Sequence, residues 1–331
     1  MEQLPQLLAL MDRPAFCVNN GIIIAVNHAA HALTLTEGMR IDTLLSSGRD
    51  AYAEFTEGCL GLELSIHGTP CTAAVTVTRW GHLVTLEPES ANADLRMLAL
   101  AAQSLRDPLS EVMALAAALP EDAPKRAELS RGLHRILRIV GNMTPHPTFR
   151  PELVELNALL RELWDKAQPA CDAAGIRFTF VPSPAPIYTA VDSGLLTRAI
   201  HNLLSNSMKF SQAKDLRLEL LRSGNSCRIR WIDPGAELPP DPFARYLREP
   251  GLEDPRFGLG LGLHLVQNAI SAHHGSALMT AAKGGGVVTE LRLSMKQDLP
   301  LHSPRYPISY TGAWDPLLVE LSDVLPPEFY Q

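Results

Sequence analysis

Apolar residues at heptad spacing mark the middle of this chain. Over residues 92–119 they recur at alternating intervals of three and four, which is the spacing of a coiled-coil seam. The seam positions are Leu95, Leu98, Ala102, Leu105, Leu109, Val112, Ala116 and Leu119. Pro108 interrupts the seam and should kink the helix, because proline lacks a backbone donor. A second helix continues the pattern through Leu129, Leu133, Ile136, Val140 and Met143.

These two helices predict a helical hairpin over residues 89–146. Contact between its two helices buries only one side of the hairpin. The remaining apolar stripe would face water in a monomer, and a second copy of the hairpin would bury it. We therefore expect a parallel homodimer held by a four-helix bundle.

The segments on either side of the hairpin have different patterns. Residues 1–88 alternate short apolar runs with turn residues, which is typical of a small α+β domain. Within them, Asn19-Asn20-Gly21 predicts a tight hairpin turn, and a second strand pair is expected to turn near Trp80-Gly81. Beyond a proline-rich linker at 144–151, residues 151–297 predict mixed α/β structure. The expected helices are 155–175, 193–210 and 262–275, and the expected strands are 176–180, 187–192, 216–222, 227–233 and 287–295.

The remaining residues, 298–331, form a proline-rich tail with one short amphipathic piece, DPLLVELSDVL. The sequence thus predicts a multidomain α+β protein.

Composition narrows the function classes. The net charge of -7 argues against a nucleic-acid partner, which would require a basic surface. No segment approaches the ~18–20 apolar residues of a membrane helix, and the acidic start MEQLPQ does not resemble a signal peptide. The five scattered cysteines predict buried thiols in a reducing compartment. We therefore expect a cytoplasmic protein without membrane contact.

Three separated motifs carry candidate chemistry, and the first is HNLLSNSMKFS. Asn202 and Asn206 are four residues apart and share a helix face. Their amide oxygens suit a hydrated magnesium ion, assigned to Asn206, and suit phosphate positioning. Lys209 adds a positive charge for phosphate.

The other two motifs lie further along the same domain. WIDPGAELPPD ends a strand at Asp233 and turns at Gly235. A buried carboxylate there could accept a hydrogen bond from the exocyclic amine of adenine, which guanine does not offer. GLGLGLHLV then places Gly258, Gly260 and Gly262 at the start of a helix, where glycines allow close approach of a polyphosphate.

In this order the three motifs resemble the N box and the two glycine boxes of the GHKL (Bergerat) ATPases, which include gyrase and histidine kinases. The resemblance implies an α/β sandwich over 151–297 that binds ATP with magnesium. The second glycine of the first box is replaced by Glu237.

From about Asp94 to Met295 the chain is similar to a sensor histidine kinase core. AQSLRDPLSEV resembles the phosphoacceptor box of that family, and residues 1–88 resemble a PAS sensor domain whose ligand the residues do not specify. The resemblance also implies a response regulator as a partner. However, Gln103 stands where the family has its phosphoacceptor histidine, and Ser104 stands where it has an acidic base. A glutamine amide is not a phosphoryl nucleophile.

Three readings therefore stay open: an ATP-dependent histidine kinase with a displaced acceptor, a pseudokinase scaffold or phosphatase without autophosphorylation, and a serine kinase of the anti-sigma-factor type. The long dimerization hairpin favours the first two. His134, on the second hairpin helix, is the candidate displaced acceptor. Its alternative role is that of a flank residue that packs its ring and exposes one nitrogen.

Overall fold

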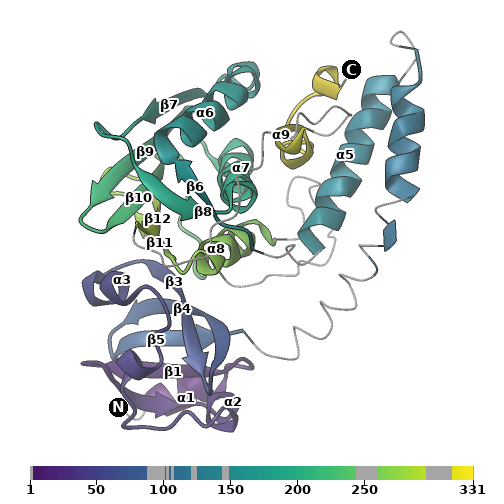
Figure 1. The fold of residues 1–331 in the computed structure, drawn as a ribbon. Coiled ribbons are helices and arrows are strands. Elements are labelled where there is room, and N and C mark those ends of the chain that lie inside the picture. The colour runs from purple at the N-terminus through teal and green to yellow at the C-terminus, as the bar shows by residue number, and fades with distance from the viewer. Residues whose placement is uncertain are drawn as a thin grey trace.

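A computed structural model describes residues 3–87, 101, 104–105, 108–120, 125–143, 149–243, 260–295 and 315–330. Gln103, Gly258 and the first three seam positions lie outside these residues. Within them the chain forms two sheet domains, a pair of long helices and a packed C-terminal segment (Figure 1).

The N-terminal domain is a five-stranded antiparallel sheet in the order β2-β1-β5-β4-β3. Its elements are α1 (Gln3–Ala9), β1 (Ala15–Asn19), β2 (Ile22–Val26), α2 (His28–Ala32), η1 (Ile41–Thr43), α3 (Arg49–Glu54), β3 (Cys59–Ile66), β4 (Thr69–Thr78) and β5 (Gly81–Leu86). The predicted hairpin is confirmed: Asn20 and Gly21 both have positive φ, of 50° and 76°, as a two-residue turn requires. The predicted turn at Trp80-Gly81 is confirmed between β4 and β5.

Both faces of this sheet are covered. One face packs on the segments that carry α2, η1 and α3, through Phe16, Ile23, Leu62 and Val84 among others. The opposite face packs on α1 through Leu4 and Leu8. Successive residues of β1 join the two cores in turn, with Phe16 and Val18 in the first and Ala15 and Cys17 in the second.

The C-terminal sheet domain contains β6 (Glu152–Glu155), α6 (Leu156–Ala173), β7 (Arg177–Val181), β8 (Tyr188–Val191), α7 (Ser193–Phe210), β9 (Asp215–Ser223), β10 (Ser226–Asp233), α8 (Gly262–Ala272), β11 (Ser276–Ala281) and β12 (Val287–Ser294). Its main strands run in the order β11-β12-β10-β9-β7, and β6 pairs with β8 in a separate two-stranded sheet. The three helices pack on one face of the main sheet and form a single apolar core with it (Figure 1).

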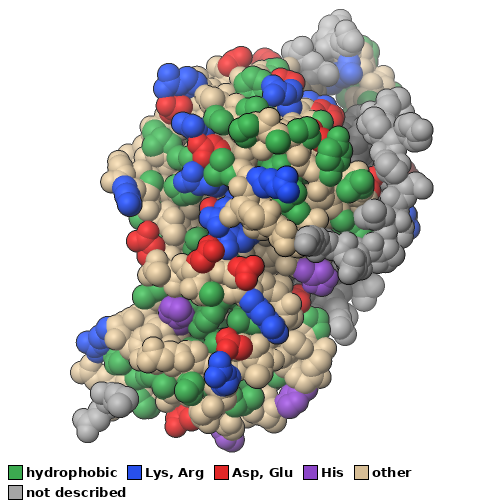
Figure 2. Space-filling view, turned by 60° about the vertical axis from the view of Figure 1, so that its left-hand side comes forward, with side chains coloured by type: hydrophobic (Ala, Val, Ile, Leu, Met, Phe, Trp, Pro, Cys, Tyr) green, Lys and Arg blue, Asp and Glu red, His purple; other side chains and the backbone are tan. Residues whose placement is uncertain are grey.

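The outer face of this main sheet is charged. Buried and partly exposed residues alternate along β10, and the partly exposed Arg228 and Arg230 join an ion-pair network with neighbouring strands. Arg230 pairs with Glu219 of β9 at 2.8 Å, and Arg292 pairs with Glu54 of α3 at 2.9 Å. Figure 2 shows basic and acidic side chains close together in the middle of the molecule on one face.

The two sheets are joined edge to edge. Strand β3 of the N-terminal domain pairs antiparallel with β11, through Cys59–Met279, Leu60–Leu278 and Gly61–Ala277. A continuous ten-stranded sheet results. Cys59 and Ala74 of the N-terminal domain consequently belong to the core of the C-terminal sheet domain.

The long helices lie beside the C-terminal sheet domain. Residues 108–117 are helical, and α5 spans Arg126–Met143. Leu109, Met113, Ala116 and Leu133 form their shared core. Val112, Leu119, Leu129 and Ile136 of the predicted seam are 40–45% exposed. None of the described helices is long and apolar enough to cross a membrane.

The C-terminal segment is packed rather than peripheral. It contains α9 (Pro316–Glu320) and η3 (Pro327–Tyr330), and it contacts both α5 and α7 (Figure 1). Leu317, Leu321, Leu325 and Tyr330 are nearly fully buried in the same core as α7. The proline-rich composition of this region does not reveal that contact.

Candidate functional site

Helix α7 positions the first candidate motif. Asp192 caps its N-terminus, because the side chain accepts a hydrogen bond from the Leu195 amide at 3.1 Å. The helix buries Leu196, Ala199 and Leu203 in the core. Asn202 and Asn206 are therefore held on a fixed face, with Asn202 fully buried and Asn206 partly exposed.

The structure brings the two asparagines to the second glycine motif. A Cβ atom added to Gly262 would lie 3.1 Å from Asn202 Oδ1 and 3.4 Å from the Asn206 amide atoms. Only a glycine leaves this approach unstrained. Gly260, two residues earlier, has a φ of +73°, which also favours glycine.

Helix α8 begins at Gly262. The residue before it, Leu261, makes no side-chain capping hydrogen bond. Backbone donors at such a helix start, next to the amide oxygens of α7, suit an anionic ligand with a hydrated cation.

Asp233 ends strand β10 and is buried. Its Oδ1 accepts hydrogen bonds from the Ser211 hydroxyl at 2.5 Å and from the Gly235 amide at 3.1 Å. The turn requires glycine at 235, because a Cβ atom there would lie 1.9 Å from the Ala213 nitrogen. The protein thus fixes Oδ1 of Asp233. Because the carboxylate is planar, this also sets the orientation of Oδ2. Ser211 was not among the predicted site residues, although it is the last residue of the first motif.

Glu237, which replaces a glycine of the resembled family, is exposed. It belongs to the segment after β10, whose neighbours Ala236 and Leu238 pack on the core.

Lys209 has an unexpected partner. Its side chain is only 6% exposed, and its Nζ lies 3.1 Å from Asp323 of the C-terminal segment. Burial lowers the pKa of Lys209, with Arg138 acting in the same direction and Asp323 opposing it. The lysine predicted to position phosphate is thus paired with a carboxylate of its own chain.

His134 is not the exposed flank residue that one alternative predicted. It is 4% exposed, and its ring contacts Tyr330 with centroids 4.9 Å apart. Its Nδ1 lies 2.8 Å from the Ser130 carbonyl oxygen. The prediction that one nitrogen reaches solvent is wrong, because the C-terminal segment covers this part of α5.

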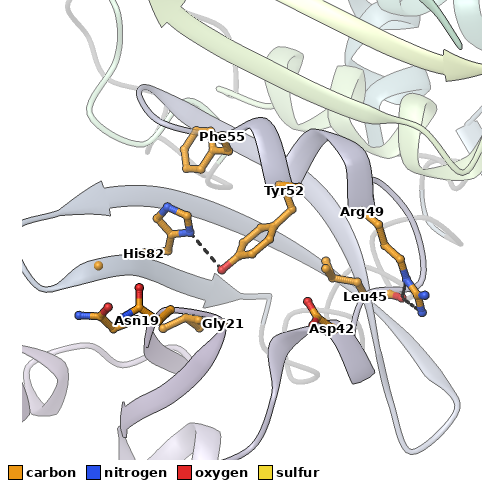
Figure 3. A pocket seen from close by; sticks show the side chains of 12 residues that line it. Asn19, Gly21, Asp42, Leu45, Arg49, Tyr52, Phe55 and His82 are labelled. Carbon is orange, nitrogen blue, oxygen red and sulfur yellow. Dashed lines mark hydrogen bonds between the residues drawn. The ribbon is translucent and has the colours of Figure 1, made fainter. Parts of the chain in front are cut away.

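A hollow of about 630 Å³ lies in the N-terminal domain, between α3 and the turns that follow β1 and precede β5. Tyr52 and His82 point toward one another across it and share a hydrogen bond of 3.0 Å (Figure 3). Burial raises the pKa of Tyr52 to about 12 and lowers the pKa of His82. Arg49 and Asp42 also line this hollow and add charged groups to it. This mixture of ring and polar groups suits a small polar ligand.

Comparisons with known proteins agree with the nucleotide motifs. Residues 191–297 match the family described as histidine kinase-, DNA gyrase B-, and HSP90-like ATPase. All of the candidate nucleotide-binding residues fall within this range.

The curated relatives are sensor kinases. The chain is 26% identical over 219 residues to the sensor-like histidine kinase SenX3 of Mycolicibacterium smegmatis, covering 60% of this chain and 57% of the relative. It is 24% identical over 245 residues to the sensor histidine kinase CpxA of Klebsiella pneumoniae, covering 69% of this chain and 53% of that protein. The chain thus spans about half the length of these relatives.

Among solved structures, the chain is similar to full-length ShkA in complex with AMPPNP. The identity is 21% and the TM-score is 0.47, over 61% of this chain and 46% of that one.

Proposed function

We propose that this protein is an ATP-binding sensor kinase of two-component signalling, which works as a homodimer with a response regulator as its partner. The observation that carries the proposal is the contact of Asn202 and Asn206 with the Gly262 turn at the start of α8. The match of residues 191–297 to the ATPase family and the sensor-kinase relatives support it.

The proposed nucleotide site uses its residues in distinct ways. The second oxygen of Asp233 accepts a hydrogen bond from the adenine amine, while Ser211 and Gly235 hold the first oxygen. The phosphates lie near the start of α8, where backbone donors favour anions. The amide oxygen of Asn206 is the ligand for a hydrated Mg²⁺, which would offset the phosphate charge.

Calorimetry with Mg-ATP and Mg-GTP tests this site. We expect the protein to bind ATP in the micromolar to millimolar range, roughly -4 to -8 kcal/mol, and to prefer ATP over GTP. Asp233→Asn should weaken ATP binding roughly 10-fold or more, because it removes a charged acceptor. Asn225→Ala, at an exposed turn far along β10 from Asp233, should leave binding unchanged. No heat at millimolar Mg-ATP would refute the proposal.

A pseudokinase is the second candidate, and two observations favour it. Ser104, at the position of the family's base, donates its hydroxyl hydrogen bond to the Ala101 carbonyl at 2.7 Å and carries no carboxylate. His134 is buried beneath Tyr330. Under this second proposal the protein binds ATP and signals without phosphorylating itself. Incubation with radiolabelled ATP separates the two candidates, because only autophosphorylation leaves an acid-labile label on the chain.

We also propose that the N-terminal domain is a PAS-like sensor and that the protein acts in the cytoplasm. The hollow beside Tyr52 and His82 supports a ligand-binding role for that domain. Thermal-shift screening of metabolite mixtures, with Tyr52→Ala as the comparison, would test it: a stabilising ligand should lose its effect in the variant.

A further inference from the structure

A buried cluster of charges joins the C-terminal segment to two helices. The Asp323 carboxylate contacts Arg138 and lies 3.1 Å from Arg135 Nε, both on α5. The same carboxylate lies 3.1 Å from Lys209 Nζ on α7. The side chain of Asp323 is only 6% exposed. One acidic residue therefore fastens the hairpin helix to the helix that carries the first nucleotide motif.

Backbone contacts reinforce this joint. The Ser205 hydroxyl of α7 donates to the Glu320 carbonyl at 3.3 Å, and Arg131 Nε of α5 donates to the Ser322 carbonyl at 3.0 Å. The segment also buries Leu321 and Leu325 completely or nearly so. Its apolar residues thus anchor the segment, and its charged residue Asp323 contacts both α5 and α7.

Lys209 lies on the same stripe of α7 as the two asparagines. It follows Asn206 by three residues and Asn202 by seven, and these spacings place side chains on one helix face. Ser205, which contacts the C-terminal segment, lies on the adjoining flank of the helix. The segment consequently covers α7 immediately beside the proposed nucleotide face.

A carboxylate and a phosphate offer a lysine the same kind of partner, an anionic oxygen at hydrogen-bonding distance. Asp323 has two arginines in addition to Lys209, so it remains paired if Lys209 turns to another anion. Breaking one contact of the cluster therefore does not leave Asp323 as an isolated buried charge, which would be costly.

We propose that residues 315–330 form an intramolecular latch in which Asp323 competes with bound nucleotide phosphate for Lys209. Nucleotide binding then loosens the joint between α7 and α5, and the latch in turn weakens nucleotide binding. The coupling is reciprocal, because each ligand of Lys209 must change the affinity of the other by the same factor. This inference rests on the nucleotide site proposed above.

The test compares Asp323→Asn with Glu328→Gln in the full-length protein by calorimetry with Mg-ATP. Both variants remove one negative charge from the same segment, but Glu328 is exposed. We expect Asp323→Asn to bind ATP roughly 5-fold or more tightly than the parent, within the usual range of coupling between sites. Glu328→Gln should bind like the parent. Equal or weaker ATP binding by a folded Asp323→Asn variant overturns the latch.

Hydrogen exchange of the unmodified protein gives a second readout that needs no variant. Amides of residues 317–325 should exchange faster when Mg-ATP is bound, and unchanged or slower exchange overturns the proposal.

Failure of the latch is distinguishable from failure of the nucleotide site. If Asn206→Ala abolishes ATP binding while Asp323→Asn leaves it unchanged, the site stands and the latch falls. If the parent binds no ATP, both fall.

Discussion

The edge-to-edge junction of the two sheets depends on a glycine that can be tested against a matched control. Gly58 has a φ of +85°, and a Cβ atom there would lie 2.1 Å from the Met279 carbonyl oxygen and 2.8 Å from Thr280 Cγ2. Gly68, in the same domain, has a φ of +80° with nothing within 4 Å. The two positions share the backbone conformation, and only Gly58 faces the C-terminal sheet domain.

Alanine at Gly68 therefore costs only the left-handed backbone strain, about 1–2 kcal/mol. Alanine at Gly58 costs the same strain and must also move β11 away from β3. Overpacking of this kind costs roughly 1–3 kcal/mol. We expect the free energy of unfolding to fall by ~2–5 kcal/mol for Gly58→Ala, which is about 1–3 kcal/mol more than for Gly68→Ala.

Urea unfolding of the parent and both variants measures this difference. Hydrogen exchange then locates it: amides of 277–279, which pair with β3, should lose protection in Gly58→Ala and keep it in Gly68→Ala. Equal destabilisation by the two variants, with unchanged protection in β11, would refute the idea that the domains are joined through this strand pair.

Three further predictions concern the acceptor box, assembly and pH. Gln103→His combined with Ser104→Glu should gain acid-labile label from radiolabelled ATP, since a positioned base alone contributes ~10²–10⁴-fold; an unlabelled double variant that binds ATP contradicts this. Val112→Asp with Leu119→Asp should convert a dimer to monomers in light scattering, because both residues lie on the exposed apolar stripe; a monomeric parent at tens of micromolar would count against the bundle. Burial lowers the pKa of His201 to about 4. Between pH ~6.5 and 4 the unfolded chain therefore binds more protons at this histidine than the folded chain does. As pH falls through that window, His201 should lower the free energy of unfolding by on the order of 3 kcal/mol. Urea titrations at several pH values should show a weaker decline for His201→Asn, and an identical decline would exclude this histidine as a cause.

The local elements of the fold were predictable because each has its own signal. The β9–β10 hairpin turns at Gly224, which has a φ of +59°, between two strands that the sequence predicted at 216–222 and 227–233. Helix α7 matches its predicted bounds, because its apolar spacing and its Asp192 cap lie within the segment itself. The candidate nucleotide residues were proposed from sequence because their residue types and order form a pattern, and the structure brings Asn202 and Asn206 of that pattern beside Gly262.

The contacts between distant segments were not predictable in this way. Strand β11 was missed, and its pairing with β3 joins residues more than two hundred positions apart. Likewise, Asp323 stands in an unremarkable amphipathic piece, and only the fold reveals that it meets Lys209. A sequence pattern reports whether a residue is apolar, charged or small, but it does not report which remote atom will fill the space beside it.

Contacts between distant segments also connect the N-terminal domain to the two glycine motifs. Gly61 lies against the Gln267 side chain of α8, and Gln267 in turn donates to the Ala73 carbonyl of β4 at 2.8 Å. Helix α8 therefore contacts the N-terminal domain at Gln267 and begins at Gly262, the last glycine of the nucleotide motif, about one and a half turns earlier. Arg13 adds a contact at 2.5 Å to Asp241, the last residue of the first glycine motif. The N-terminal domain is thus tied to structure bordering both glycine motifs, through contacts in which the long helices take no part.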